Sequence, residues 1–195
     1  MVHLKQADPV MRAIIERVGP CRMQFSPPAF ESLAETIVYQ QLNGKAAVTI
    51  FDRFAALAGE PLTPGGILQL TDEQMRSVGL SKQKSSYLKD LAAKTEAGIL
   101  NFSRLPDLPD EEVIAHLIQV KGIGVWTAQM FLMFTLKRAN VLPTGDYGVQ
   151  AAIKKHYRKR KMPKPEVMAK IAKCWEPYRS VACWYLWRSL DIKTP

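Results

Sequence analysis

Hydrophobic residues recur every three to four positions along most of the chain, which is the spacing of one face of an α-helix. Alternating patterns bounded by hairpin turns, which would indicate β-strands, are nearly absent. Two clear helical sets are Phe30, Leu33, Ile37 and Val38, and Ile50, Phe51, Phe54 and Leu57. The sequence therefore predicts an all-α protein of about ten helices.

Capping residues indicate where these helices begin and end. Asp8-Pro9 supplies an N-cap followed by proline at the first helical position, and Gly19 can end that helix. Further predicted starts are Ser26-Pro27, Thr63-Pro64, Thr71, Ser81, Pro109, Asp146, Pro165 and Pro177, and further predicted ends are Gly59, Gly79 and Gly98. The last two helices are rich in tryptophan, and core packing is the expected role of Trp175, Trp184 and Trp187.

Two glycines interrupt the helical pattern near the middle of the chain. Apolar residues at helical spacing precede Gly122 and Gly124, and the pattern resumes from Trp126 to Phe134. This arrangement predicts two helices joined by a glycine hairpin. The second helix would direct its first N–H groups and the positive end of its dipole outward, which favours a DNA phosphate. On the hairpin alone, a tight turn without any ligand explains the glycines equally well.

The same glycines could begin a dinucleotide-binding fingerprint. However, Thr127 occupies the place of the third glycine, and the preceding residues have the periodicity of a helix and not of a strand. A nucleotide cofactor site is therefore not expected here.

The composition of the chain indicates what kind of partner it binds. The chain has 195 residues, of which 47% are hydrophobic, so it can bury a core as one domain or as two small lobes. Its formal net charge of +9 favours a polyanionic partner, because Lys and Arg displace counterions from phosphates. This charge supports DNA binding without proving it.

Cysteine usage and hydropathy bear on the compartment. Cys21, Cys174 and Cys183 form neither a paired framework nor a metal-ligand spacing, which favours a reducing environment. The N-terminus lacks an apolar signal core, and no run is long enough to span a bilayer. We therefore expect a cytoplasmic protein without a membrane partner. No pattern speaks to oligomeric state, and we take a monomer as the expectation.

Four separated motifs resemble one known family. Lys121-Gly-Ile-Gly-Val-Trp-Thr-Ala128, followed by Asp146 in Pro143-Thr-Gly-Asp-Tyr-Gly148, resembles the helix-hairpin-helix (HhH-GPD) superfamily of DNA glycosylases, and most of all its 3-methyladenine DNA glycosylase II branch. Gln40-Gln-Leu-Asn-Gly-Lys-Ala-Ala47 and Pro177-Tyr-Arg-Ser-Val-Ala182 agree with that branch. The resemblance implies a single glycosylase domain over residues 1–195, built of two helical lobes with a cleft between them. It also implies that the additional N-terminal α/β domain of some relatives is missing.

Asp146 is the candidate catalytic residue. The resemblance implies that its carboxylate stabilises the oxocarbenium-like sugar that forms as the damaged base leaves. An aspartate after a glycine is also an ordinary helix N-cap, and position alone favours that structural role. Catalysis is therefore assigned through the resemblance.

The resemblance also implies a base pocket of Trp126, Tyr178 and Met130. Relatives that cut the sugar–phosphate chain carry a Schiff-base lysine in place of Trp126, so a monofunctional enzyme is implied. Aromatic faces attract a cationic N-alkylated purine, such as 3-methyladenine or 7-methylguanine, by roughly 0.5–2 kcal/mol. Met130 replaces a tyrosine of some relatives, which leaves lesion preference open. A glycosylase for deaminated or mismatched bases and a non-catalytic DNA-binding module remain the alternatives.

The remaining implied sites contact the DNA. Gln41 or Leu42 would fill the gap left by the flipped nucleotide, although a helix end closed by Asn43-Gly44 explains this segment equally well from its residues alone. The residues implied to hold phosphate are Lys121, Gly122, Gly124 and Thr127.

No cofactor is expected to be required. The resemblance implies a monovalent cation, Na⁺ or K⁺, on the main-chain carbonyls of Ile118, Val120 and Gly122. The four-cysteine cluster of some relatives is missing, so no iron–sulfur cluster is expected, and His3, His116 and His156 are scattered.

Overall fold

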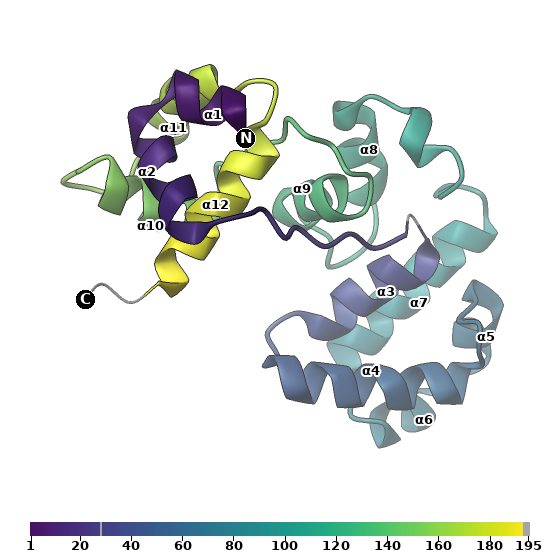
Figure 1. Cartoon of the computed structure of the whole chain (residues 1–195). Coiled ribbons are helices and arrows are strands. Elements are labelled where there is room, and N and C mark those ends of the chain that lie inside the picture. The colour runs from purple at the N-terminus through teal and green to yellow at the C-terminus, as the bar shows by residue number, and fades with distance from the viewer. Residues whose placement is uncertain (28, 193–195) are drawn as a thin grey trace. The chain divides into compact units, whose positions relative to one another are not determined.

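The computed structural model describes residues 1–27 and 29–192 (Figure 1). These residues form twelve α-helices, two short 3₁₀-helices and no strand, which confirms the all-α prediction. The α-helices are α1 (Val2–Ala7), α2 (Pro9–Val18), α3 (Phe30–Tyr39), α4 (Gly44–Ala58), α5 (Pro64–Gln69), α6 (Asp72–Ser77), α7 (Lys82–Glu96), α8 (Asp110–Leu117), α9 (Val125–Phe134), α10 (Tyr147–His156), α11 (Pro165–Ala172) and α12 (Arg179–Asp191); the 3₁₀-helices are η1 (Leu105–Asp107) and η2 (Lys173–Trp175). Across the part of the chain that is described, no helix is both long enough and apolar enough to cross a membrane.

Most helices begin at the predicted caps. The side chains that accept a hydrogen bond from the first turn of the helix that follows are those of Asp8, Asn43, Thr63, Thr71, Ser81 and Asp146. The prediction of a helix start at Ser26-Pro27 is wrong, because α3 begins at Phe30. Pro27 is itself followed by proline in the sequence, which biases it away from the helical conformation.

The chain divides into two compact units. Unit 1 comprises Met1–Phe25 and Leu132–Pro195, and unit 2 comprises Ser26–Phe131. Unit 1 therefore contains the first two and the last three α-helices, unit 2 contains α3 to α8, and α9 crosses the boundary.

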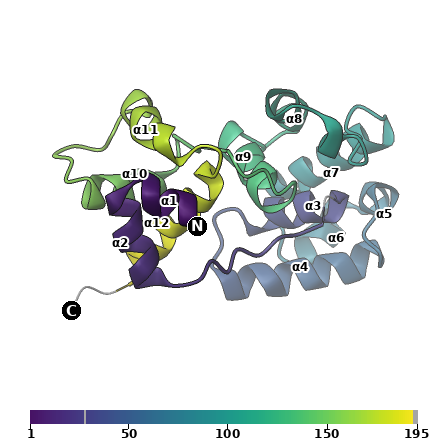
Figure 2. The same cartoon turned by 45° about the horizontal axis from the view of Figure 1, so that its top comes forward.

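Unit 1 is assembled from both ends of the chain. The C-terminal helix α12 packs against α2 and α10, so the purple and yellow helices of Figures 1 and 2 share one core. Trp175 and Tyr185 are fully buried in it. Core packing was expected for Trp184 and Trp187 as well, but these two tryptophans of the unit are only half-buried.

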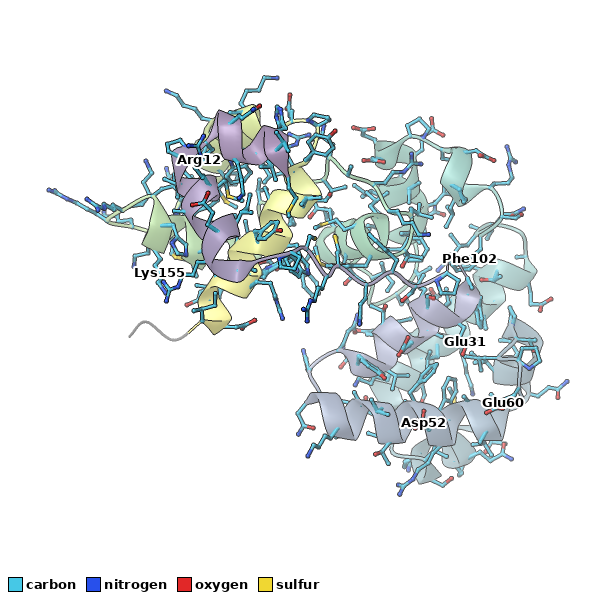
Figure 3. All side chains as sticks on the ribbon, in the orientation of Figure 1. Arg12, Glu31, Asp52, Glu60, Phe102 and Lys155 are labelled. Atoms are coloured by element: carbon cyan, nitrogen blue, oxygen red, sulfur yellow. The ribbon has the colours of Figure 1, made fainter. Side chains whose placement is uncertain are left out.

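Unit 2 is organised around α7. This helix packs against α3, α5 and α6, and α3 also packs against α4. Phe102 joins the core of this unit, because its ring meets those of Phe30 and Phe131 edge to face at 6.1 and 6.3 Å (Figure 3). Such aromatic pairs add to the stabilisation that burial alone provides.

Candidate active site

Asp146 lies at the N-terminus of α10 in unit 1. Only 7% of its surface is exposed. Its Oδ1 accepts a hydrogen bond of 2.7 Å from the main-chain N–H of Val149, which makes it the N-cap of the helix. The same oxygen accepts a second bond of 2.7 Å from the indole Nε1–H of Trp187 on α12. The cap that the sequence predicts is thus present, and a donor from a distant helix is added to it.

Trp187 reaches Asp146 because residue 148 has no side chain. A methyl group added to Gly148 would lie 2.8 Å from Cδ1 and 3.0 Å from Nε1 of the Trp187 indole. The indole is also stacked on Phe134, with the ring centres 5.9 Å apart and the planes inclined by 29°. The final glycine of Pro143-Thr-Gly-Asp-Tyr-Gly148 therefore has a packing reason.

The Pro177-Tyr-Arg-Ser180 segment fastens the chain that leads to Asp146. The Ser180 main-chain N–H donates to the Ala139 carbonyl at 2.9 Å, and its hydroxyl donates to the Arg138 carbonyl and accepts from the Val141 N–H. These contacts hold the backbone just before Leu142-Pro-Thr-Gly-Asp146 in place.

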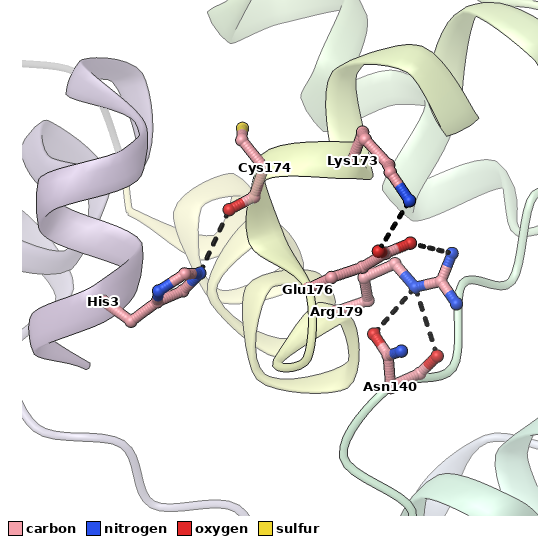
Figure 4. A network of polar contacts seen from close by, with 6 residues as sticks. All are labelled: His3, Asn140, Lys173, Cys174, Glu176 and Arg179. Carbon is pink, nitrogen blue, oxygen red and sulfur yellow. Dashed lines mark hydrogen bonds and ion pairs between the residues drawn. The ribbon is translucent and has the colours of Figure 1, made fainter.

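Arg179 and its neighbours also bind the loop before Asp146 (Figure 4). The Arg179 Nε–H donates to both oxygens of Asn140, at 2.9 Å to the side chain and 3.2 Å to the main chain. Glu176 pairs with Arg179 on one side and with Lys173 on the other. Arg179 and Ser180 of the motif therefore hold the loop of residues 138–141 by hydrogen bonds. The sequence alone did not indicate this role.

The tyrosine of that motif, Tyr178, is exposed. It retains 40% of its surface, and its ring meets that of His3 edge to face at 5.6 Å. His3 is in turn within 3.2 Å of the Cys174 carbonyl, as Figure 4 shows. Next to Asp146, Tyr147 is 77% exposed, the highest value among the large hydrophobic residues described. An aromatic surface therefore accompanies the carboxylate in this unit.

Unit 1 also contains a cavity of about 720 Å³ next to the indole of Trp187. Three aromatic and two basic residues take part in its lining, which consists of Val18, Pro20, Arg22, Gln24, Phe134, Trp184, Trp187 and Arg188. Sequence reasoning did not find this cavity, because its walls come from three segments far apart in the chain.

The glycine hairpin lies in unit 2 and is held by α7. Gly122 has a φ of 80°, and a side chain there would also overlap the ring of Tyr87. The main-chain N–H of Lys121 donates to Asp90 at 2.8 Å. Burial acts to raise the pKa of Asp90, but hydrogen bonds from Lys94 and from the Lys121 N–H outweigh it, so the pKa lies below its ordinary value. Asp90 is therefore ionised and anchors the start of the hairpin.

The proposed wedge segment is attached to the same hairpin. The Gln40 side-chain amide donates to the Gly122 carbonyl at 3.0 Å. Gln41 follows with a φ of 58°, a left-handed conformation that is uncommon for residues other than glycine, and Leu42 is 37% exposed. The alternative that Asn43-Gly44 closes the preceding helix is wrong, because Asn43 caps the start of α4.

The remaining predicted residues of unit 2 differ in exposure. Trp126 is 47% exposed and the Lys121 side chain 65%, whereas Thr127 is only 5% exposed and Met130 is half-buried. A methyl group added to Gly124 would meet no atom within 4 Å. The backbone at the start of α9 is therefore open to a ligand on this side.

Two of the three carbonyls expected to hold a cation already accept hydrogen bonds. The Val120 carbonyl accepts from the Ile123 N–H at 3.0 Å, the Gly122 carbonyl accepts from Gln40, and Ile118 is 44% exposed. Each carbonyl has two lone pairs, so these bonds leave room for a further ligand. Within residues 1–27 and 29–192, no three or more His, Cys, Asp or Glu side chains group as a metal site.

The two units hold different parts of the predicted site. Asp146 and Tyr178 belong to unit 1, and Trp126, Met130, Gln41 and the hairpin belong to unit 2. Within each unit the structure places the predicted residues beside contacts that the sequence did not reveal, namely the Trp187 bond in unit 1 and the Asp90 bond in unit 2.

Comparison with known proteins identifies the family. The model of the HhH-GPD superfamily base excision DNA repair proteins matches residues 34–177, and the chain belongs to this family. The putative DNA-3-methyladenine glycosylase YfjP of Bacillus subtilis (strain 168) is 35% identical over 188 residues, which cover 93% of this chain and 66% of that protein. DNA-3-methyladenine glycosylase 1 of Schizosaccharomyces pombe is 34% identical over 197 residues, covering 98% of this chain and 86% of that protein.

Solved structures agree with this assignment. A DNA-3-methyladenine glycosidase from Bacillus halodurans aligns with a TM-score of 0.84 and 37% identity, over 95% of this chain and 85% of that one. The 3-methyladenine DNA glycosylase Mag1 of Schizosaccharomyces pombe, solved in complex with abasic DNA, aligns with a TM-score of 0.83 and 33% identity, over 98% of this chain and 96% of that one.

Proposed function

We propose that this protein is a monofunctional DNA glycosylase of base excision repair that hydrolyses the N-glycosidic bond of alkylated purines such as 3-methyladenine or 7-methylguanine. The observation that carries the proposal is the Asp146 carboxylate, held by two hydrogen bonds at the start of α10 in a chain of the HhH-GPD superfamily. The relatives named as 3-methyladenine glycosylases supply the substrate class.

The chemistry assigned to Asp146 is electrostatic. As the bond between base and sugar breaks, positive charge develops on the sugar, and a fixed carboxylate beside the anomeric carbon lowers the energy of that state. The same group orients the water that completes hydrolysis. The indole of Trp126 cannot attack the sugar, so no Schiff base forms and the DNA strand is left uncut.

The damaged base is proposed to enter a pocket of Trp126, Tyr178 and Met130. The two aromatic side chains keep 47% and 40% of their surfaces exposed, so their faces are available for stacking. Alkylated purines carry positive charge, which an aromatic face attracts. The flexible thioether of Met130 suits a pocket that accepts more than one alkylated purine.

Double-stranded DNA is the proposed partner of the hairpin. Gly122, Gly124, Thr127 and the Lys121 ammonium would hold the backbone through main-chain N–H groups and charge. Gln41 or Leu42 would fill the space of the flipped nucleotide, and both are exposed. A monovalent cation, Na⁺ or K⁺, on the carbonyls of Ile118, Val120 and Gly122 would add positive charge there.

The proposed working form is a monomer that acts inside the cell on chromosomal DNA and needs no cofactor for the chemistry. Base release from a panel of duplexes tests the activity. The panel contains 3-methyladenine, 7-methylguanine, hypoxanthine, uracil and undamaged bases. Release of the alkylated purines without strand cutting supports the proposal.

Other outcomes of the panel select the alternatives. Preference for hypoxanthine or uracil would indicate a glycosylase for deaminated bases. Duplex binding without release of any base would indicate a non-catalytic DNA-binding module and would refute the proposed activity.

A further inference from the structure

We propose that Trp187 is a positioning residue, whose indole N–H sets the orientation of the Asp146 carboxylate for catalysis. This role rests on the proposed function of Asp146. It is carried by the 2.7 Å bond from Nε1 of Trp187 to Oδ1 of Asp146, by the stacked ring of Phe134 and by the missing side chain at Gly148.

One hydrogen bond does not fix a carboxylate. The last torsion of an aspartate side chain is broad, so a single bond such as that from the Val149 N–H leaves a carboxylate some freedom to rotate. The Trp187 indole donates to the same oxygen from a different helix, α12. Two donors in different directions set the plane of the carboxylate. Stabilisation of the developing sugar cation depends on such preorganisation, because a group that must reorient loses part of its effect.

The indole itself is held by two contacts besides its bond to Asp146. Phe134 stacks against it at 5.9 Å, and the backbone of Gly148 lies close enough that a methyl group there would press on Cδ1 and Nε1. A side chain at position 148 would therefore force the indole to shift from its place beside Asp146. This explains why the indole is half-buried and lies beside the helix start instead of inside the core.

The competing explanation is a clip that only fastens α12 to α10. A clip would affect the free energy of unfolding, whereas a positioning residue affects the chemical step. The two are separated by single-turnover base release from a 3-methyladenine duplex, by affinity for a duplex with an abasic-site analogue, and by thermal unfolding, each measured on the same variants.

Trp187→Phe removes the donor and keeps an aromatic ring. We expect the single-turnover rate to fall about ten- to hundredfold, while affinity for the abasic-analogue duplex is unchanged. Trp184→Phe is the matched control, because it removes an indole from the same helix and the same cavity but not from Asp146. The control should retain the wild-type rate.

Gly148→Ala keeps Trp187 but displaces its indole, because the added methyl group would lie 2.8 Å from Cδ1, and it would lie 3.2 Å from Oδ1 of Asp146. The clip model predicts lower thermal stability with a normal rate, although the higher helix propensity of alanine offsets part of that loss. The positioning model predicts a rate that falls toward that of Trp187→Phe. The double variant should lose no more than the single ones, because both act through one contact.

An active wild type with an unchanged rate in Trp187→Phe overturns the role of Trp187 and leaves the proposed function standing. A rate loss in Trp187→Phe matched by an equal loss of abasic-duplex affinity also overturns it. By contrast, a wild type that releases no base, or an Asp146→Asn variant as fast as wild type, refutes the proposed function itself.

Discussion

Two buried aspartates of unit 1 have the same local structure. Asp8 and Asp146 are 5% and 7% exposed, and each caps a ten-residue helix. Each also accepts a hydrogen bond from an indole, from Trp175 at 2.8 Å and from Trp187 at 2.7 Å respectively. A capping aspartate with a tryptophan donor is therefore not in itself a catalytic feature.

Their surroundings differ. At Asp8 the main-chain donors meet Oδ1, while Trp175 and the Tyr157 hydroxyl meet Oδ2, and Trp175 has no exposed surface. At Asp146 the N–H groups of Val149 and Trp187 both donate to Oδ1, and the neighbouring Tyr147 is 77% exposed. The comparison teaches that the cap motif fixes a carboxylate in place, and the accessibility of its surroundings decides whether chemistry can follow.

Helix α10 connects the two. Asp146 is its N-cap, and Tyr157, which follows its last residue, donates to Asp8. Burial raises the pKa of Tyr157, and so does its bond to Asp8, so the hydroxyl stays protonated and remains a donor. The structural aspartate thus anchors the helix whose other end carries the proposed catalytic one.

The largest expected effect is that of Asp146→Asn. Asparagine is a competent N-cap of nearly the same shape, so thermal stability should change little. The charge facing the sugar cation is lost, and we expect a fall of at least about a hundredfold in single-turnover release of 3-methyladenine. Affinity for an abasic-analogue duplex should persist. Equal rates for variant and wild type would remove Asp146 from the mechanism.

The same substitution at Asp8 should have the opposite outcome. Asparagine can keep the cap, but its amide would place a donor against the Trp175 N–H, and the charge-assisted bonds are lost. We expect the free energy of unfolding to fall by about 2–3 kcal/mol, measured by chemical denaturation. Base release by the folded protein should keep the wild-type rate. A slow but fully stable Asp8→Asn variant would contradict the division of roles between the aspartates.

The sequence predicts those features of the Asp8 and Asp146 sites that depend on residues close together in the chain. The caps at Asp8 and Asp146 and the glycine turn are properties of neighbouring residues, and short-range geometry decides them. The indole donors cannot be predicted in this way, because Trp175 and Trp187 lie far from the aspartates in sequence and reach them only through packing of α12 and η2. The same holds for the bond from the Lys121 N–H to Asp90.

Helix boundaries were predicted wrongly where two local rules compete. Ser26 looks like a cap, but the prolines after it delay α3 until Phe30. Asn43-Gly44 can end one helix or begin the next, and the structure uses it to begin α4. The catalytic assignment of Asp146 and the pocket of Trp126 and Tyr178 come from family resemblance and stay predictions.

DNA affinity provides a smaller but distinct contrast between the aspartates. With a net charge of +9, binding to undamaged duplex should weaken steeply as salt rises, by about 0.9 in the log–log slope per phosphate neutralised. Asp8→Asn should leave affinity and slope unchanged. Asp146→Asn should bind equally or more tightly, because a negative charge near the DNA is removed. Fluorescence anisotropy over a salt series measures both, and a slope near zero for wild type would contradict DNA binding by charge.

The smallest expected effect lies at the end of α10 farthest from Asp146, where basic residues run from Lys154 to Lys161 and Lys155 is exposed (Figure 3). Exposed charges at a helix end are mobile and screened, so the change Lys155→Gln with Lys159→Gln should weaken binding only about two- to fivefold. The loss should be the same for damaged and undamaged duplexes, because phosphate contacts carry no information about the base. Lys164→Gln with Lys170→Gln removes equal charge from α11 and its N-cap position and corrects for net charge. If the order of preferred lesions changed, the pocket would not be that of Trp126 and Tyr178.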